Sequence, residues 1–282
     1  QAVIAVENTR LINETRAALE QQKASADILH VISQSPTEVR PVFDAIVSTA
    51  VHLLDCDRAV ILLCDARHFW AAAAATQAAG VAASVEGTRL PLDPALNFPS
   101  RAILSRSVLH LPDWNAIEDL PAHESHIRDC SGVRSGLMVP LLREGACIGL
   151  LALVRVRALA FSDKQIALAQ SFSDQAMIAI GNTHLFNETK EALDRQTATS
   201  DVLKVMSASP ADVRPVYEAI VLAALRLLNC EMCILLRVDG TNYSPAAGAG
   251  PQGLLDDMGP SHIPIDPTLN FPSRCIQSRA ML

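Results

Sequence analysis

Residues 134–154 read RSGLMVPLLREGACIGLLALV, and this stretch decides the fold. Two runs of mostly apolar residues, 135–142 and 146–156, stand on either side of Arg143-Glu144-Gly145. Apolar runs joined by a short connection with glycine are typical of paired β-strands, because glycine readily takes the positive φ of a tight turn. The sequence therefore predicts a β-hairpin here.

A long helix is predicted directly after the hairpin. Ser162 stands three residues before Gln165, which is the spacing of a capping box at a helix start. Within residues 164–185 apolar side chains recur at helical spacing, at Ile166, Ala169, Phe172, Ala176 and Ile180. We expect this helix to cover one face of the sheet that contains the hairpin.

Two further helices are predicted before the hairpin. A polar helix over residues 11–32 should end before Ser35-Pro36, because proline disfavours helix in the residue that precedes it. Pro41 suits the first turn of a second helix over residues 42–54. The polar positions of the first helix leave two interpretations open. Positions 4, 11, 18, 25 and 32, which are mostly apolar, follow the seven-residue spacing of a coiled coil. The helix is therefore either a solvated connecting helix or one that packs against a second copy as a dimer seam.

The remaining residues predict a sheet. We expect strands at residues 58–65 and 107–111, a strand or helix at the alanine-rich run 69–76, an extended segment at 89–92 and a short helix at 100–105. The polar stretch between Asp113 and Gly132 is expected to be a solvated loop. The fold class is therefore α+β, with a mostly antiparallel sheet of about six strands flanked by helices.

An internal repeat sets the domain organisation. Residues 4–43 recur as residues 178–217, shifted by 174 positions, with 22 of 40 residues identical. Residues 93–101, DPALNFPSR, recur as DPTLNFPSR at residues 266–274. A repeat of this length is too long for a solenoid and predicts duplicated domains.

Composition places the chain among ordinary globular proteins. Of its 282 residues half are apolar and 19% are charged. A net charge of −7 without basic runs argues against binding to nucleic acid or anionic membranes. The apolar runs fall far short of the roughly 18–20 residues that span a bilayer, and the first residues lack the basic segment of a signal peptide. Seven cysteines without disulfide spacing favour a reducing, cytoplasmic location.

These features together resemble a GAF domain. Residues 134–154, then Phe161-Ser162-Asp163 and a helix ending in QAMIAIGN at residues 175–182, are similar to the C-terminal half of that family. The segment VLHLPD at residues 108–113 resembles the family's strand that ends in Pro-Asp. The resemblance implies a GAF fold with a ligand pocket beside residues 97–101.

The repeat and the resemblance predict four segments joined by long connecting helices. They are a tail helix of a preceding repeat with a connecting helix (1–35), a complete GAF domain (36–185), a connecting helix (186–209) and the first part of a second GAF domain (210–282). On this interpretation the chain is a fragment of a longer protein, and the second domain lacks its hairpin and closing helix.

The linker carries the functional part of the resemblance. LFNETKEAL at residues 185–193 is similar to linkers of bacterial sensor proteins with several GAF domains in tandem. This implies a small-molecule sensor of a two-component system, coupled through helices to an output domain outside the chain, most often a histidine kinase of a phosphorelay. The alternative output is a nucleotide cyclase. A catalytic domain with an unrecognised site and a structural dimerisation rod without ligand stay open as alternatives.

No residue pattern predicts catalysis, a metal or a cofactor in this chain. Cys230-x-x-Cys233 lacks the second pair that a zinc site requires, and Cys233 enters a predicted strand. His123-Glu124-Ser125-His126 has no further ligand nearby and falls in the predicted loop. Cys130 is followed by serine, where bilin-binding relatives of the GAF family have histidine.

The predicted ligand-binding residues are those of the repeated NFPSR motif, together with Trp114. An arginine near the start of a short helix, where backbone N–H groups are free, can hold an anionic ligand. The alternative is a capped helix start whose phenylalanine packs in the core. The predicted residues are Asn97, Phe98, Ser100, Arg101 and Trp114 in the first copy, and Asn270, Phe271, Ser273 and Arg274 in the second.

Overall fold

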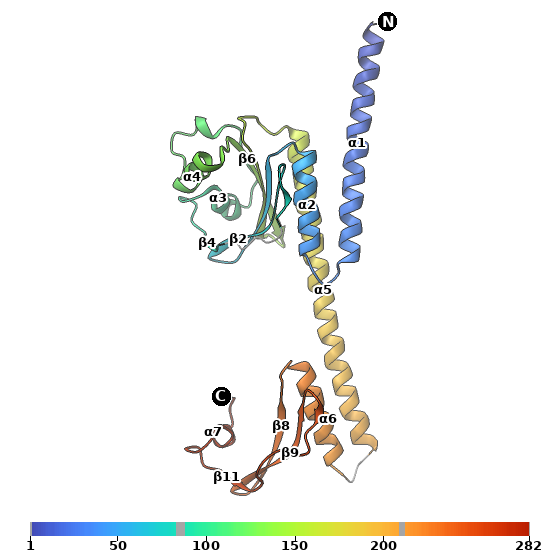
Figure 1. The fold of residues 1–282 in the computed structure, drawn as a ribbon, viewed down its shortest axis with the longest axis vertical. Helices are drawn as coiled ribbons and strands as arrows, with labels where there is room; N and C mark the ends of the chain where they lie inside the picture. Colours follow the sequence, from blue (N-terminus) through green and yellow to red (C-terminus); the bar gives the residue numbers. More distant parts are fainter. Residues whose placement is uncertain (1, 83–87, 209–211, 282) are drawn as a thin grey trace. The chain divides into compact units, whose positions relative to one another are not determined.

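The computed structural model describes residues 2–82, 88–208 and 212–281, which form two compact units, Gln1–Asn187 and Glu188–Leu282 (Figure 1). Helix α5 (Asp163–Ala208) begins in the first unit and ends in the second, so the predicted closing and connecting helices are one continuous helix. The described helices include none that is both long and apolar enough to cross a bilayer.

The first unit is built on an antiparallel sheet. Its strands follow the order β3-β2-β1-β7-β6-β5, and β4 pairs with β2. They are β1 (Arg58–Cys64), β2 (His68–Thr76), β3 (Gly80–Val81), β4 (Leu90–Pro91), β5 (Leu109–Leu111), β6 (Ser135–Arg143) and β7 (Ala146–Arg155). The predicted α+β fold is confirmed, and the alanine-rich run is a strand.

The predicted hairpin lies at the centre of this sheet. Strands β6 and β7 pair in the register Val139↔Leu151, and Gly145 in their connection has φ of 81°. On its other side β7 pairs with β1, in the register Ile61↔Leu151. The two strands approach so closely that a Cβ on Gly149 would lie 2.2 Å from the carbonyl oxygen of Leu62. The pairing of β1 with β7 therefore requires glycine at position 149.

Helices cover both faces of the sheet (Figure 1). On one face α1 (Ala2–Gln34), α2 (Arg40–Leu53) and α5 enclose the main core, to which the strands contribute side chains such as Ile61, Leu137 and Leu151. On the other face α3 (Phe98–Ser105) and α4 (Ala122–Ser131) cover a second core with Met138 and Leu150. Side chains alternate between the two cores, as the two-residue period of a strand requires.

The predicted helix starts are confirmed by their local geometry. Pro41 lies in the first turn of α2. At the start of α5 the backbone N–H of Ser162 donates to Oε1 of Gln165 at 3.0 Å, and the N–H of Gln165 donates to Oγ of Ser162 at 3.4 Å, which is the reciprocal pattern of a capping box. These features need contacts within a few residues only, which is why they are legible in the sequence.

The loop predicted between Asp113 and Gly132 is wrong. This stretch holds the short helix η1 (Trp114–Ala116) and the ten-residue helix α4, which ends at Gly132 with φ of 70°. The second face of the sheet is apolar and needs a cover, so the polar segment folds over it with its few apolar side chains inward. Pro121 and Gly132 bracket this helix and were the available signals for it.

The second unit follows the local plan of the first. It contains α6 (Arg214–Leu227), β8 (Cys233–Asp239), β9 (Asn242–Gly250), β10 (Gly253–Leu254), β11 (Ile263–Pro264) and α7 (Phe271–Ser278), with a sheet in the order β10-β9-β11 and β8 paired with β9. The bulge between Ile61 and Leu62 in the β1–β2 pair recurs between Leu235 and Leu236 in the β8–β9 pair, 174 positions later.

The two units differ in how many neighbouring strands their equivalent strands pair with. Strand β1 lies between β2 and β7, whereas β8 pairs with β9 alone among the described strands. The buried core of the second unit is correspondingly small, with Val221, Ala247 and Ala249 at its centre.

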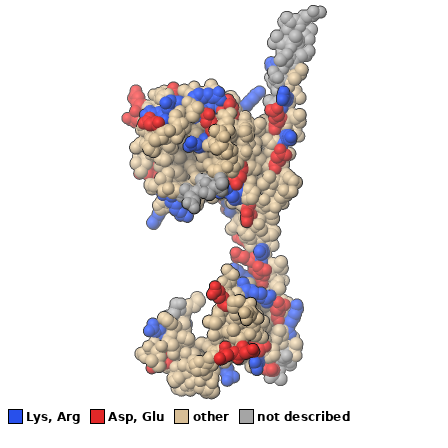
Figure 2. All heavy atoms as spheres, viewed as in Figure 1, with Lys and Arg blue, Asp and Glu red and all other residues tan. Residues whose placement is uncertain are grey.

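Acidic and basic side chains are interspersed on the surface in view (Figure 2).

Candidate functional site

A cavity of about 310 Å³ lies between the sheet of the first unit and helices α3 and α4. Its floor is mostly apolar and comes from strands β1, β2, β4, β6 and β7, with Leu62, Phe69, Met138 and Ala152 among its side chains. Arg58 of β1 also lines it. Its cover includes Pro99 of α3, Trp114 of η1 and His123, Glu124 and Ile127 of α4. A volume near 300 Å³ is at the lower end of the range for small-molecule sites.

Glu124 is the most unusual side chain of this cavity. It is only 1% exposed. Its Oε1 accepts a hydrogen bond of 2.7 Å from the backbone N–H of Phe98, while Oε2 is buried without a hydrogen-bond partner among the described residues. Burial raises the pKa of this carboxyl to about 7, against the opposing effects of that hydrogen bond and of the charge on Arg101. Near neutral pH the cavity therefore holds a carboxyl group that is poised to gain or lose a proton.

Trp114 supplies a second polar atom without a partner. Its indole is buried, and Nε1 has no acceptor among the described residues. The ring packs edge-on against Phe98 with centroids 5.6 Å apart. Gly136 makes room for it, because a Cβ there would lie 3.3 Å from the indole. The cavity thus offers one carboxyl oxygen and one N–H donor, both buried and unpartnered among the described residues, on walls that are mostly apolar.

The predicted residues around α3 form a capped helix start. Oδ1 of Asn97 accepts a bond of 2.8 Å from the N–H of Ser100, and the buried Oγ of Ser100 accepts one of 3.0 Å from the N–H of Asp93. Nε of Arg101 donates to the carbonyl of Pro94 at 2.7 Å, and its guanidinium lies over the ring of Phe98. Of the five residues predicted in this copy, Trp114 lines the cavity, and the other four hold α3 in place beside it.

The second copy repeats the cap but not its surroundings. The N–H of Ser273 donates to Oδ1 of Asn270 at 2.9 Å, and Nε of Arg274 donates to the carbonyl of Pro267 at 2.9 Å. Phe271, however, is 72% exposed, whereas Phe98 is 1% exposed. The motif therefore determines the helix start, and the buried environment of its phenylalanine comes from the rest of the domain.

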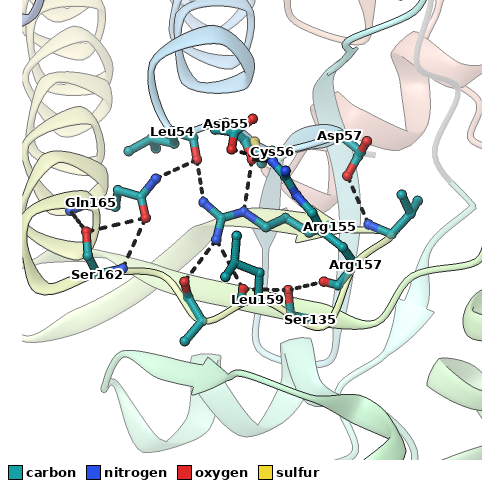
Figure 3. Close-up of polar contacts among 12 residues, drawn as sticks. Leu54, Asp55, Cys56, Asp57, Ser135, Arg155, Arg157, Leu159, Ser162 and Gln165 are labelled. Atoms are coloured by element: carbon teal, nitrogen blue, oxygen red, sulfur yellow. Dashed lines mark hydrogen bonds and ion pairs between the residues drawn. The ribbon is translucent and has the colours of Figure 1, made fainter.

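A second polar cluster joins the sheet to α5 (Figure 3). Arg155, at the end of β7, is buried and donates to four backbone carbonyls, which belong to Leu54, Asp55, Leu159 and Ala160 at 2.7–3.1 Å. We call Arg155 and these carbonyls the Arg155 joint. The guanidinium also lies 3.8 Å from the ring centroid of Phe161, which precedes α5.

Helix α5 contacts the same joint directly. Nε2 of Gln165 donates to the carbonyl of Leu54 at 3.0 Å, and this carbonyl also accepts from Arg155. The carbonyls of Leu159 and Arg157 accept from Oγ of Ser135 at 3.1 Å. The end of α2, the strands β6 and β7 and the start of α5 therefore share one hydrogen-bonded cluster.

The other candidate groups that the sequence singled out do not assemble into a metal site in the described part of the chain. The described residues include no group of three or more His, Cys, Asp and Glu side chains that could hold a metal. Cys230 and Cys233 are free and half-buried, and His126 of α4 lies 3.7 Å from the sulfur of Cys130. A larger hollow, of about 710 Å³, lies in the second unit beside α6, but it is lined by exposed charged side chains such as Glu191 and Arg195.

Comparison with known proteins agrees with this architecture. Residues 38–180 match the family model of the GAF domain. No curated protein matches the sequence. The GAF domain of a phosphoenolpyruvate-protein phosphotransferase from Coxiella burnetii is 13% identical with a TM-score of 0.50, covering 61% of this chain and 98% of that chain. The photosensory core module of a Stigmatella aurantiaca phytochrome is 15% identical with a TM-score of 0.52, covering 80% of this chain and 48% of that chain. At these identities the likeness concerns the fold.

Proposed function

The chain belongs to the GAF domain family and is a sensory or regulatory module, and we propose that it binds a small molecule in the cavity beneath α3 and α4 and relays its binding through α5. The observation that carries this proposal is the pair of buried polar atoms without partners, Oε2 of Glu124 and Nε1 of Trp114. A buried polar group left unsatisfied costs about 1–3 kcal/mol, which a ligand with matching groups recovers on binding.

The cavity also indicates which kind of ligand it takes. Its walls are apolar, so the ligand body is apolar or aromatic and small. Oε2 of Glu124 needs a hydrogen-bond donor while it is ionised, and Nε1 of Trp114 needs an acceptor. A neutral planar molecule with an amide-like donor and acceptor meets both requirements.

We assign different roles to the predicted residues. Trp114 contacts the ligand, while Asn97, Phe98 and Ser100 position α3. Arg101, whose charge acts on Glu124 but which lies outside the cavity lining, is proposed as the contact for an anionic substituent that extends from the neutral ligand body beyond the cavity. Asn270, Phe271, Ser273 and Arg274 are proposed as the corresponding set of a second GAF domain. This assignment is supported by the same cap in both copies.

The Arg155 joint supports the relay. Any ligand that shifts β6 or β7 acts on Arg155 and Ser135, and both are bonded to the segment that starts α5. Because α5 runs on for 46 residues without interruption, a shift or rotation at its start is transmitted along its length. A bias of this kind requires that the ligand bind one of two arrangements more tightly.

We further propose that the chain is part of a tandem-GAF sensor of a bacterial two-component system, with a histidine kinase of a phosphorelay as its output. A nucleotide cyclase is the alternative output. The repeat of sequence, caps and bulge in the second unit supports the tandem arrangement, in which residues 36–185 and 210–282 belong to successive GAF domains. Seven free cysteines favour the cytoplasm.

Self-association through the long helices is proposed on a separate observation. Leu11, Leu19 and Leu29 are exposed on α1, and their repeat equivalents Leu185, Leu193 and Leu203 are exposed on α5. Exposed leucines at equivalent positions of two helices favour a partner helix of a second copy. Sedimentation of the Leu19→Glu, Leu193→Glu double variant should show a smaller species than wild type, while the exposed control pair Gln22→Glu, Gln196→Glu should not. A monomeric wild type contradicts this proposal.

Ligand binding is testable with two single-ring probes of similar size, benzamide and benzoate. Trp70 and Trp114 are the chain's two tryptophans and both line the cavity, so intrinsic fluorescence reports on it. We expect saturable binding of benzamide on the order of millimolar, as befits so small a molecule. Benzoate should bind at least about tenfold more weakly at pH 8, since two carboxylates repel each other.

Variants separate cavity binding from surface binding. Ala152→Leu fills the cavity floor and should abolish the benzamide signal, while Ala79→Leu, at an exposed turn, should leave it unchanged. Trp114→Phe keeps an aromatic ring but removes the N–H donor, and should weaken benzamide binding as seen by Trp70. A signal that does not saturate, or that persists in Ala152→Leu, refutes the assignment of this cavity.

A further inference from the structure

Two free cysteines meet where β1 ends and β7 begins. Cys64 is the last residue of β1 and Cys147 the second of β7, and the two strands are antiparallel neighbours with Leu63 opposite Gly149. Sγ of Cys64 donates to the carbonyl oxygen of Cys147 at 3.4 Å, and Sγ of Cys147 donates to the carbonyl oxygen of Gly149 at 3.0 Å. Both residues are half-buried. The two cysteines are therefore in contact and border the same core, although 83 positions separate them in the sequence.

We propose that Cys64 and Cys147 are a redox modification site, which forms a reversible disulfide between β1 and β7 when a hydroperoxide oxidises it. The thiolate of Cys147 attacks one oxygen of the peroxide, the O–O bond breaks, and a sulfenic acid and hydroxide form. The thiol of Cys64 then attacks this sulfur, the S–O bond breaks and water leaves. In total two thiols and one H₂O₂ give one disulfide and two waters, and an external thiol reverses the reaction.

The surroundings distinguish the two sulfurs. The neighbouring side chain of Cys64 lowers the pKa of Cys147, helped by backbone groups at Gly149 and Leu141 and by the charge of Arg106, while burial opposes the shift. The same pairing raises the pKa of Cys64. Cys147 therefore has the greater thiolate fraction and attacks first, and Cys64 resolves the intermediate. By contrast, burial raises the pKa of Cys56 to about 12, so this thiol should stay inert.

Access to the pair comes from the outer end of the hairpin. Cys147 stands opposite Leu142, directly after the bulge in the β6–β7 pairing, and the side chain of Leu142 is exposed. Bulges leave a residue unpaired and bend the strand locally, and both thiols at this end of the sheet are only partly buried, so we expect a small oxidant to reach them. The site also lies on the cavity side, because Cys64 and Cys147 pack against the same core as Leu62 and Leu150. A disulfide here joins the central strands beside the cavity.

The test uses the full chain and hydrogen peroxide. After one equivalent of peroxide, free thiols are alkylated and the digested protein is analysed by mass spectrometry. We expect loss of two of the seven free thiols, a peptide that links Cys64 to Cys147, and recovery of seven thiols with dithiothreitol. Fluorescence-monitored urea unfolding should shift to higher urea in the oxidised protein, because the cross-link closes a long loop.

Serine variants assign the roles. Cys64→Ser should accumulate a dimedone-reactive sulfenic acid on Cys147, and Cys147→Ser should form no internal link and leave Cys64 unmodified. Cys130→Ser, at an exposed cysteine of α4, should behave as wild type. The proposal is overturned if peroxide oxidises Cys130 in preference to the pair, or if Cys64 and Cys147 are oxidised separately without a link.

Discussion

Replacing Arg155 with lysine should destabilise the first unit far more than the same replacement at Arg157. The two arginines stand two residues apart, and both donate to the carbonyl of Asp55. Arg155 is 1% exposed and spreads four hydrogen bonds over carbonyls of the α2 end and of the loop before α5. The side chain of Arg157 is about half exposed and forms an ion pair with the carboxylate of Asp55. The pair of variants therefore compares a buried guanidinium with an exposed one.

The magnitude follows from the geometry of the Arg155 joint. A lysine keeps the charge, but its donors lie on one atom and cannot reach carbonyls on two sides of the guanidinium. We expect the loss of two of the four bonds in Arg155→Lys. Each bond to a charged group contributes about 1.5–3 kcal/mol, so the free energy of unfolding should fall by at least about 3 kcal/mol. Arg157→Lys removes at most an exposed ion pair, which contributes about 0–1 kcal/mol.

Urea unfolding of the full chain measures this difference. Both tryptophans, Trp70 and Trp114, lie in the first unit, so their fluorescence follows that unit without contribution from the second. With a urea dependence of about 2 kcal/mol per molar, the midpoint of Arg155→Lys should fall by about 1.5 M relative to wild type. A midpoint within about 0.5 M of that of Arg157→Lys would refute the view that this buried joint holds α5 to the sheet.

Three further predictions concern other parts of the fold. The pKa of Glu124 is about 7 in the folded chain against 4.5 unfolded, so its stabilising contribution is present below pH 4.5 and lost as pH rises through 7. The free energy of unfolding of Glu124→Gln, relative to that of wild type, should therefore be up to about 3 kcal/mol higher at pH 8 than at pH 4.5. A difference between their urea midpoints that does not change with pH contradicts this. Gly149→Ala should lower the stability of the first unit by several kcal/mol or unfold it, because the added Cβ would meet backbone. Gly181→Ala in α5, with open space around it, should raise the stability by up to about 1 kcal/mol. Thermal unfolding temperatures that rank the two variants alike would contradict the close β1–β7 contact. Amides of Cys233–Asp239 should exchange with solvent faster than those of Arg58–Cys64, since β8 pairs with one described strand and β1 with two; equal protection would show that the second unit is self-sufficient.

Much of the fold is encoded in short stretches of sequence. The β6–β7 hairpin, the capping box of Ser162 and Gln165, the start of α2 at Pro41 and the cap of Asn97 depend on residues close together in the chain. Such features form wherever their few residues occur, which is why the cap of Asn270 repeats that of Asn97 although the surroundings differ. The repeat and the family resemblance were likewise visible in the sequence alone.

The site itself depends on contacts that no local pattern contains. Glu124 belongs to a polar segment that resembles a loop, and it becomes a buried carboxyl only because α4 folds over the apolar second face of the sheet. In the sequence Arg155 does not differ from other charged residues at strand ends. Only the tertiary structure brings the carbonyls of residues 54–55 and 159–160 within hydrogen-bond distance of it. Cys64 and Cys147 meet only because β1 and β7 pair across the sheet. The sequence by itself determined most of the elements, such as the β6–β7 hairpin and the starts of α2 and α5, since helix caps, turns and strand runs are set by near neighbours. Tertiary structure alone decided which polar groups, such as Glu124 and Arg155, are buried away from solvent, because burial depends on how the helices pack on the sheet.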